Sequence, residues 1–284
     1  MRFSRVTAGL LTATLIAGAV SLSGCAGSIA VTPMKPKVAP PVVARAGELT
    51  VAVDMSYPPF ASKSGQDRVG WDIDVAAALA DRLGLKLVLV DAKPEAAAKL
   101  LTARKADMVL GDLTIARALD LDVAFAGSYT SDAPAIFASK GATPSPDALG
   151  GKRIAVQKGS EAYWQLADTY GEPALTIYPS LREAISAVAE GQADVAAGDA
   201  IVGGYMLHDF PKVAFAGQLA VATPVGVGVS RSTPKLEEAV RRALDEMSAQ
   251  GILSTLRRKW VGDLPQLKSP GAEASSSVVA TSAP

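Results

Sequence analysis

Apolar and polar positions follow two different periods along the middle of the chain. Short apolar runs at 49–53 and 85–90 predict buried β-strands. Between them, apolar residues at 73–83 recur every three or four positions, which predicts an amphipathic helix. Gly84 follows this helix, and glycine suits the left-handed conformation that ends helices. The pattern therefore predicts strands that alternate with helices.

The same alternation continues and is repeated after the prolines at 144 and 146. Strands are predicted at 107–110, 153–156, 175–178, 194–197 and 225–229, and helices at 95–104, 161–169, 181–190, 237–248 and 252–260. Such alternation is typical of mostly parallel sheets flanked by helices, an α/β fold. Two series of similar length predict two lobes.

The first residues have the pattern of an export signal. Arg2 and Arg5 precede an apolar run at 6–20, which is too short to span a bilayer and has the length of a signal-peptide core. Leu22-Ser23-Gly24-Cys25 then resembles the bacterial lipobox, whose cysteine is acylated. This resemblance predicts a lipoprotein signal peptide at 1–24 and an anchor of fatty acids such as palmitate on Cys25. The alternative is an unmodified thiol after an ordinary signal peptide.

Two segments outside the predicted body are rich in small residues and proline. Residues 25–47 are predicted to be a flexible tether, and residues 265–284 a disordered tail, because neither composition buries a core. The folded body is therefore expected at about 48–264.

Composition excludes several classes of function. Lys and Arg number 28, and so do Asp and Glu, so the chain lacks the positive charge that nucleic acid binding requires. One Cys and one His exclude a disulfide framework and a Cys/His zinc site within the chain. No phosphate-binding loop, dinucleotide turn or HExxH motif is present. We expect no metal, no cofactor and no nucleic acid partner.

Three aspartates lie just past predicted strands: Asp54, Asp112 and Asp199. Ligands of open α/β sheets bind at the carboxyl ends of strands, so these side chains are expected to converge on one cleft. The alternative is that each caps a turn or a helix.

Several motifs in order along the body resemble the polar-amino-acid class of bacterial solute-binding proteins. They include Val53–Phe60, Val69–Ala76, Gly151–Ser160, Gly191–Val195 and the ending Lys259-Trp260. The resemblance covers essentially the whole body. It implies a type II periplasmic-binding-protein-like fold, with lobe 1 at 48–134 and 224–264, lobe 2 at 135–223, and a ligand held between them by hinge closure.

The family implies a function and partners. The chain would be a monomeric, lipid-anchored, extracytoplasmic protein that passes a small polar solute to the permease of an ABC importer. Two alternatives stay open on the same fold: a sensor or scaffold that no longer serves transport, and an exported dehydratase. In the dehydratase, Glu161 or Asp112 would act as general acid. His208 and Ser160 show no triad spacing, and we expect no enzymatic activity.

The resemblance assigns roles in the cleft. Asp54 and Asp199 match carboxylates that contact the ligand's amino group, while Tyr57 and Phe60 match its aromatic wall. For Phe60, packing in the core is the simpler interpretation. Two positions match polar contacts of the family, namely Thr114 and Ser160.

Departures from the family pattern point to an altered pocket. The arginine that holds a ligand carboxylate falls on Leu119, and the nearest arginine is Arg117. Asp112 and Glu161 replace small hydroxyl residues. Added carboxylates without an arginine favour a cationic or amine-bearing ligand, because buried charge must be paired. If the loop is shifted by two residues, Arg117 regains the role and an amino acid is expected.

Overall fold

The computed structural model describes residues 35–269. The predicted signal peptide, the predicted acylation site Cys25 and the tail beyond residue 269 lie outside the described residues. Within 35–269, no helix combines the length and the apolar character needed to cross a membrane.

Lobe 1 is built on a sheet of five strands in the order β5-β1-β6-β13-β7. Their bounds are Glu48–Val53 (β1), Lys86–Asp91 (β5), Met108–Thr114 (β6), Ala124–Asp132 (β7) and Thr223–Val229 (β13). β1 pairs in parallel with β5 and β6, and β13 is antiparallel to both β6 and β7. Every strand except β13 therefore runs in one direction.

Lobe 2 repeats this arrangement in the order β10-β9-β11-β8-β12. Its strands are Pro134–Ser139 (β8), Ile154–Gln157 (β9), Leu175–Tyr178 (β10), Val195–Asp199 (β11) and Val213–Gln218 (β12). β9 pairs in parallel with β10 and β11, while β8 is antiparallel to β11 and β12. The predicted α/β fold with two mostly parallel sheets is confirmed.

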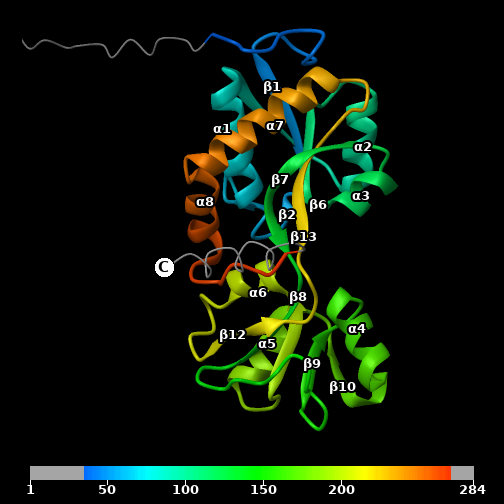
Figure 1. Cartoon of the computed structure of the whole chain (residues 1–284), viewed down its shortest axis with the longest axis vertical. Coiled ribbons are helices and arrows are strands. Elements are labelled where there is room, and N and C mark those ends of the chain that lie inside the picture. The colour runs from blue at the N-terminus through cyan, green and yellow to red at the C-terminus, as the bar shows by residue number, and fades with distance from the viewer. Residues whose placement is uncertain (1–34, 270–284) are drawn as a thin grey trace, which may run out of the picture. The chain divides into compact units, whose positions relative to one another are not determined.

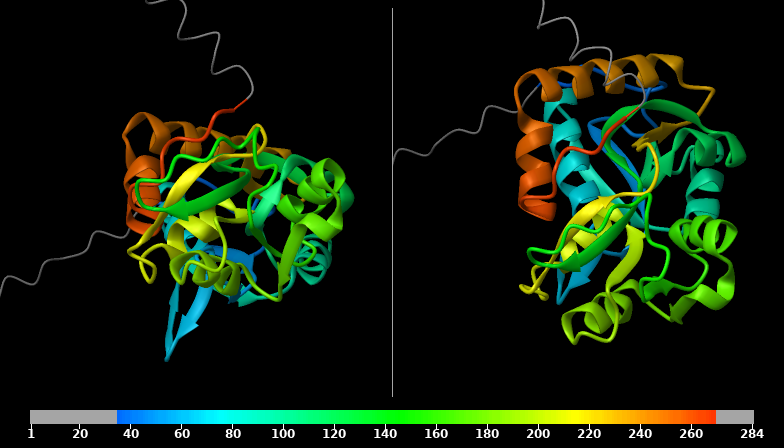
Figure 2. Two further views of the ribbon diagram at one scale, coloured as in Figure 1. Left: turned by 90° about the horizontal axis from the view of Figure 1, so that it is seen from below. Right: turned by 60° about the horizontal axis from the view of Figure 1, so that its bottom comes forward.

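Helices cover both faces of each sheet (Figures 1 and 2). In lobe 1, α1 (Trp71–Leu83), α7 (Pro234–Ala249) and α8 (Ile252–Val261) pack on one face, and α2 (Pro94–Thr102) and α3 (Ile115–Asp120) on the other. In lobe 2, α4 (Glu161–Tyr170) lies opposite α5 (Leu181–Ala189) and α6 (Ala200–Met206), and a short 3-10 turn spans Glu172–Ala174. Gly84 ends α1 in the left-handed conformation, as predicted.

A small antiparallel sheet that the hydrophobic pattern did not predict precedes α1. It consists of β2 (Ser56–Tyr57), β3 (Ala61–Ser64) and β4 (Asp67–Val69). Gly70 joins β4 to α1 against the backbone of Phe60, where an added Cβ would lie 2.1 Å from the carbonyl oxygen. Only glycine permits this close approach.

The predicted tether is too long. Val43 is fully buried in the core, and Val38 and Val42 pack against it. The backbone is also held, since the N–H of Lys37 donates to the carbonyl of Leu83 and that of Ala44 to Oδ1 of Asp107, at 2.9 and 2.7 Å. The proline-rich composition predicted a segment without a buried face, but its valines pack into the core. The segment from about residue 37 therefore belongs to the folded body.

The predicted tail begins too early for the same reason. Leu264 and Leu267 are each 5% exposed. Beyond them, the N–H of Ala222 donates to the carbonyl of Lys268 at 2.8 Å, and the N–H of Lys268 donates to Oε1 of Gln218 at 2.7 Å. The chain after α8 therefore lies along the segment that joins β12 to β13.

Candidate functional site

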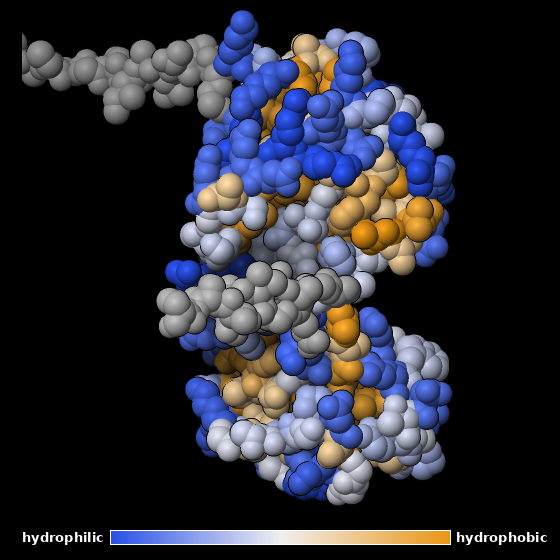
Figure 3. Space-filling view, viewed as in Figure 1, coloured by the Kyte–Doolittle hydropathy of each residue, from blue (hydrophilic) through white to orange (hydrophobic). Residues whose placement is uncertain are grey.

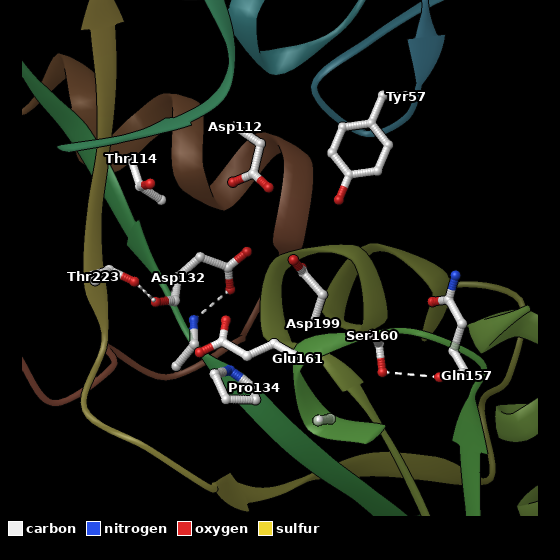
Figure 4. A pocket seen from close by; sticks show the side chains of 12 residues that line it. Tyr57, Asp112, Thr114, Asp132, Pro134, Gln157, Ser160, Glu161, Asp199 and Thr223 are labelled. Atoms are coloured by element: carbon white, nitrogen blue, oxygen red, sulfur yellow. Dashed lines mark hydrogen bonds between the residues drawn. The ribbon is translucent and has the colours of Figure 1, made fainter. Parts of the chain in front are cut away.

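A cavity of about 280 Å³ lies where the two lobes meet (Figure 4). Lobe 1, lobe 2 and both connecting segments contribute to it. Its lining residues are Tyr57, Asp112, Thr114, Asp132, Ala133, Pro134, Gln157, Ser160, Glu161, Ala162, Asp199 and Thr223. This lining contains four carboxyl groups and no Lys, Arg or His side chain.

Asp132 ends β7 at the first crossover between the lobes. It is only 6% exposed, and its Oδ1 accepts hydrogen bonds from the N–H groups of Ala133 and Ile201, at 2.8 and 3.1 Å. Oδ2 is buried and receives no donor from the described residues. Figure 4 shows the side chain directed into the space below Asp112. A buried acceptor without a donor is uncommon, so this oxygen is available to a ligand.

Asp199 ends β11 and caps α6. Its Oδ1 accepts a hydrogen bond from the N–H of Val202 at 2.8 Å, so the predicted capping role is observed in a side chain that also lines the cavity.

Asp112 lies in β6 with a φ of 52°, in the left-handed region that non-glycine residues rarely adopt. The pairing of β6 with β13 shifts register at this point, between Gly226 and Gly228. A bulge of this kind redirects side chains, and here it places the carboxylate in the cavity. The alternative that Asp112 caps the next helix is wrong, because Thr114 accepts the capping hydrogen bond from the N–H of Arg117 at 3.2 Å.

The three aspartates perturb one another. Burial, followed by the charges of Asp199, Asp72 and Glu161, raises the pKa of Asp112 well above its ordinary value. Burial and the Asp199 carboxyl group likewise raise the pKa of Asp132, and burial raises the pKa of Asp199. Crowded carboxylates without a cationic partner retain protons more readily, which is why the pKa values of these aspartates are raised.

The aromatic residues form a stack that leads away from the cavity. The ring of Tyr57 lies 5.4 Å from that of Phe60, which lies 6.4 Å from that of Trp71. Phe60 is fully buried and does not line the cavity, so it supports Tyr57 from the core. Tyr57 is 36% exposed, and its partial burial together with the charges of the nearby aspartates raises its pKa, so the hydroxyl stays protonated at neutral pH.

Ser160 and Glu161 begin α4. The hydroxyl of Ser160 accepts the N–H of Tyr163 at 3.1 Å and donates to the carbonyl of Gln157 at 3.0 Å. Glu161 is exposed at the mouth of the cavity. Ser160 therefore shapes the wall, whereas Glu161 supplies charge.

Asp54 and Arg117 lie apart from this group. They line a second cavity of about 350 Å³, which shares Tyr57, Asp112 and Thr114 with the first. Lys93 pairs with Asp54 at 2.9 Å, and Ser56 donates to Asp54 from both its N–H and its hydroxyl. Asp54 therefore caps this turn, the alternative role that the sequence predicts.

Neither candidate for a carboxylate anchor lines the first cavity. Arg117 forms an ion pair with Glu95. Leu119 is 64% exposed on α3, where Figure 3 shows hydrophobic residues gathered on the surface of lobe 1. A shift of the loop that would direct Arg117 into the first cavity is not observed.

Three polar lining residues were not predicted, namely Asp132, Gln157 and Thr223. Gln157 falls in the motif before Ser160, and its position past a predicted strand was the available signal. Asp132 also ends a strand, but that strand is too polar to be predicted by its pattern. Within 35–269, no three His, Cys, Asp or Glu side chains are arranged to hold a metal ion.

Known proteins resemble the chain along its folded body. The family model described as bacterial extracellular solute-binding proteins, family 3, matches residues 49–263. The putative ABC transporter arginine-binding protein 2 of Escherichia coli (strain K12) is 26% identical over 215 residues, covering 74% of this chain and 88% of that protein. The lysine/arginine/ornithine-binding periplasmic protein of the same strain is 26% identical over 223 residues, covering 74% and 86%.

A solved structure shows the same fold. The ancestral cationic amino acid solute binding protein superimposes with a TM-score of 0.67 at 28% identity, covering 76% of this chain and 96% of that one. All three of these proteins are named for binding rather than for catalysis.

Proposed function

Because the chain belongs to the bacterial extracellular solute-binding proteins of family 3, we propose that it captures a small, positively charged solute between its lobes for an ABC importer. The observation that carries this proposal is the composition of the 280 Å³ cavity, whose four carboxyl groups face no cationic side chain of the lining. A solute with an ammonium or guanidinium group supplies the missing charge.

The position of the cavity supports capture by closure. Tyr57 and Asp112 come from lobe 1, Glu161 and Asp199 from lobe 2, and Asp132 from the crossover. A solute that contacts both lobes favours the closed arrangement by the contacts it gains there. Asp132 is well placed to transmit this change, because it also binds the N-terminus of α6 through the N–H of Ile201.

The relatives support a cationic solute. Those described above are named for arginine, for lysine, arginine and ornithine, and for cationic amino acids, all of which carry a positively charged side chain. The permease that receives the solute is proposed on the basis of the family. Export followed by acylation of Cys25 would anchor the protein at the outer face of the membrane. We propose that it acts there as a monomer.

Thermal unfolding in the presence of a solute panel tests the proposal. The full chain, with Cys25→Ser to prevent acylation, is heated with amino acids, amines, carboxylates and sugars. A solute at a hundredfold excess over its dissociation constant stabilises the fold by about 2.7 kcal/mol. A cationic solute should stabilise the protein and make it more compact in small-angle scattering. If no cationic solute in the panel does so, the proposal fails.

A further inference from the structure

We propose that the cavity binds an organic dication without a carboxylate, such as a short diamine or an amino-guanidine, as the solute of the function proposed above. The inference begins with charge. Asp112, Asp132, Glu161 and Asp199 reach the cavity from four different elements. The buried Oδ2 of Asp132 lacks a donor, so at least one acceptor is directed into the cavity without a partner.

The number of charges indicates a dication. Asp112, Asp132 and Asp199 are three carboxyl groups that line the inside of the cavity, and no cationic side chain of the lining pairs with any of them. Glu161 is exposed and stays hydrated at the mouth. Even if one of the three keeps a proton, the other two each require a cationic partner. Since closure removes water, a monocation would leave one of these charges unpaired.

The cavity offers no place for a ligand carboxylate. Capture of a carboxylate in two hydrogen bonds requires a guanidinium at its surface. Arg117 pairs with Glu95 and lines the second cavity rather than this one, and Leu119 takes the family's arginine position. A carboxylate in this cavity would instead face Asp112, which costs repulsion between like charges.

The arrangement fits an extended organic cation better than a metal ion. No three acidic, His or Cys side chains within 35–269 converge as metal ligands, so the carboxyl groups are distributed around the space. Ala133, Pro134 and Ala162 lie among them and present apolar surface to a methylene chain. The hydroxyl of Tyr57 adds a polar contact on the lobe 1 side.

Matched pairs of ligands test the inference by calorimetry on the full chain with Cys25→Ser. Lysine is compared with 1,5-diaminopentane, and arginine with agmatine, because each pair differs only by the carboxylate. We expect the compound without the carboxylate to bind at least about tenfold more tightly, equivalent to about 1.4 kcal/mol. Equal or tighter binding of lysine or arginine overturns the inference. So does saturable binding of Ca²⁺ or Mg²⁺ at lower concentrations than either diamine.

Substitutions in the cavity test which carboxyl groups contact the diamine. Asp132→Asn and Asp112→Asn should each weaken binding of the better diamine by about tenfold or more, since each removes a charge-assisted hydrogen bond. Asp168→Asn is the matched control, because Asp168 is exposed on α4 and outside the cavity lining. Unchanged affinity in both cavity variants contradicts the inference. A loss of diamine binding in Arg117→Gln contradicts it as well, because it would place Arg117 in the site.

The outcomes also separate this inference from the proposed function. Stabilisation by lysine or arginine, with no response to any diamine, overturns the dication and leaves capture of a cationic solute standing. Stabilisation only by neutral or anionic solutes overturns both. Absence of binding across the whole panel overturns both.

Discussion

The ammonium nitrogen of Lys93 lies 2.9 Å from Oδ2 of Asp54 and 2.6 Å from the hydroxyl of Ser56. Burial alone would raise the pKa of Asp54, but the hydrogen bonds from Lys93 and Ser56 outweigh it and lower the pKa. Asp54 is therefore an ionised carboxylate whose cation comes from the protein. The aspartates of the 280 Å³ cavity have no such partner in its lining.

This difference predicts unequal effects of two conservative substitutions. Asp199→Asn should weaken binding of a cationic solute by about tenfold or more, because a hydrogen bond to a charged group contributes about 1.5–3 kcal/mol. Asp54→Asn should weaken it by less than about threefold, since Lys93 already neutralises Asp54. Calorimetric titration of both variants against the same amine measures the ratio. Equal losses would place Asp54 in direct contact with the solute.

Proton release should accompany binding. Asp112 and Asp132 have raised pKa values in the empty protein, whereas a bound cation favours their ionised forms. Affinity for the cation should therefore fall as pH is lowered below neutral. Titrations at pH 7 in buffers of different ionisation enthalpy should show protons leaving the protein. A heat that is independent of the buffer, with constant affinity at lower pH, would contradict this prediction.

Asp72 should make stability depend on pH in the direction opposite to that of a salt-bridged aspartate. Burial outweighs the hydrogen bond from the Tyr129 hydroxyl and raises the pKa of Asp72 from 3.8 to about 7. The folded state then binds more protons than the unfolded state between these values. The contribution of Asp72 is fully present below pH 3.8 and is lost as pH rises through about 7.

Replacing Asp72 by Asn should flatten this dependence. Urea unfolding of the ligand-free protein at pH 5 and pH 8 gives the change in unfolding free energy for Asp72→Asn and for the parent chain. Asp81→Asn, at an exposed position on the same helix, is the control. The same slope in Asp72→Asn and in the parent would show that Asp72 does not titrate in this range.

The end of the body should contribute to its stability. Leu267 is 5% exposed, and replacing a buried leucine by alanine costs about 2–5 kcal/mol. Leu267→Ala should lower the unfolding free energy by an amount in this range. Val221→Ala, at a residue that is 58% exposed, should change it by less than about 0.5 kcal/mol. Similar values for the two variants would mean that the segment after α8 does not contribute to the folded core.

Local patterns in the sequence are sufficient to predict most of the helices and strands. The predicted helix at 73–83 is observed at Trp71–Leu83, and the predicted strand at 49–53 at Glu48–Val53. Both depend on apolar residues recurring at the period of the element and on an end signal such as Gly84. β7, β8, β12 and the small sheet before α1 were not predicted. β7 is rich in small and polar residues and is held by pairing with β13, which is distant in sequence. The strands of the small sheet are short and pair with their neighbours in the chain, so they have no hydrophobic run long enough to predict a strand.

Strand ends identified Asp112 and Asp199 as candidates, because the position of a residue past a strand can be inferred from sequence. The role of Asp132 depends on the N–H of Ile201, which lies 69 residues away. The pairings of Asp54 with Lys93 and of Arg117 with Glu95 likewise join α2 to other segments. Hydrophobic periodicity relates residues that are near one another in the sequence, and it determines where helices and strands form. The partner of each charge is set by contacts between segments distant in sequence, so only the tertiary structure decided which carboxylates face the cavity without a cation.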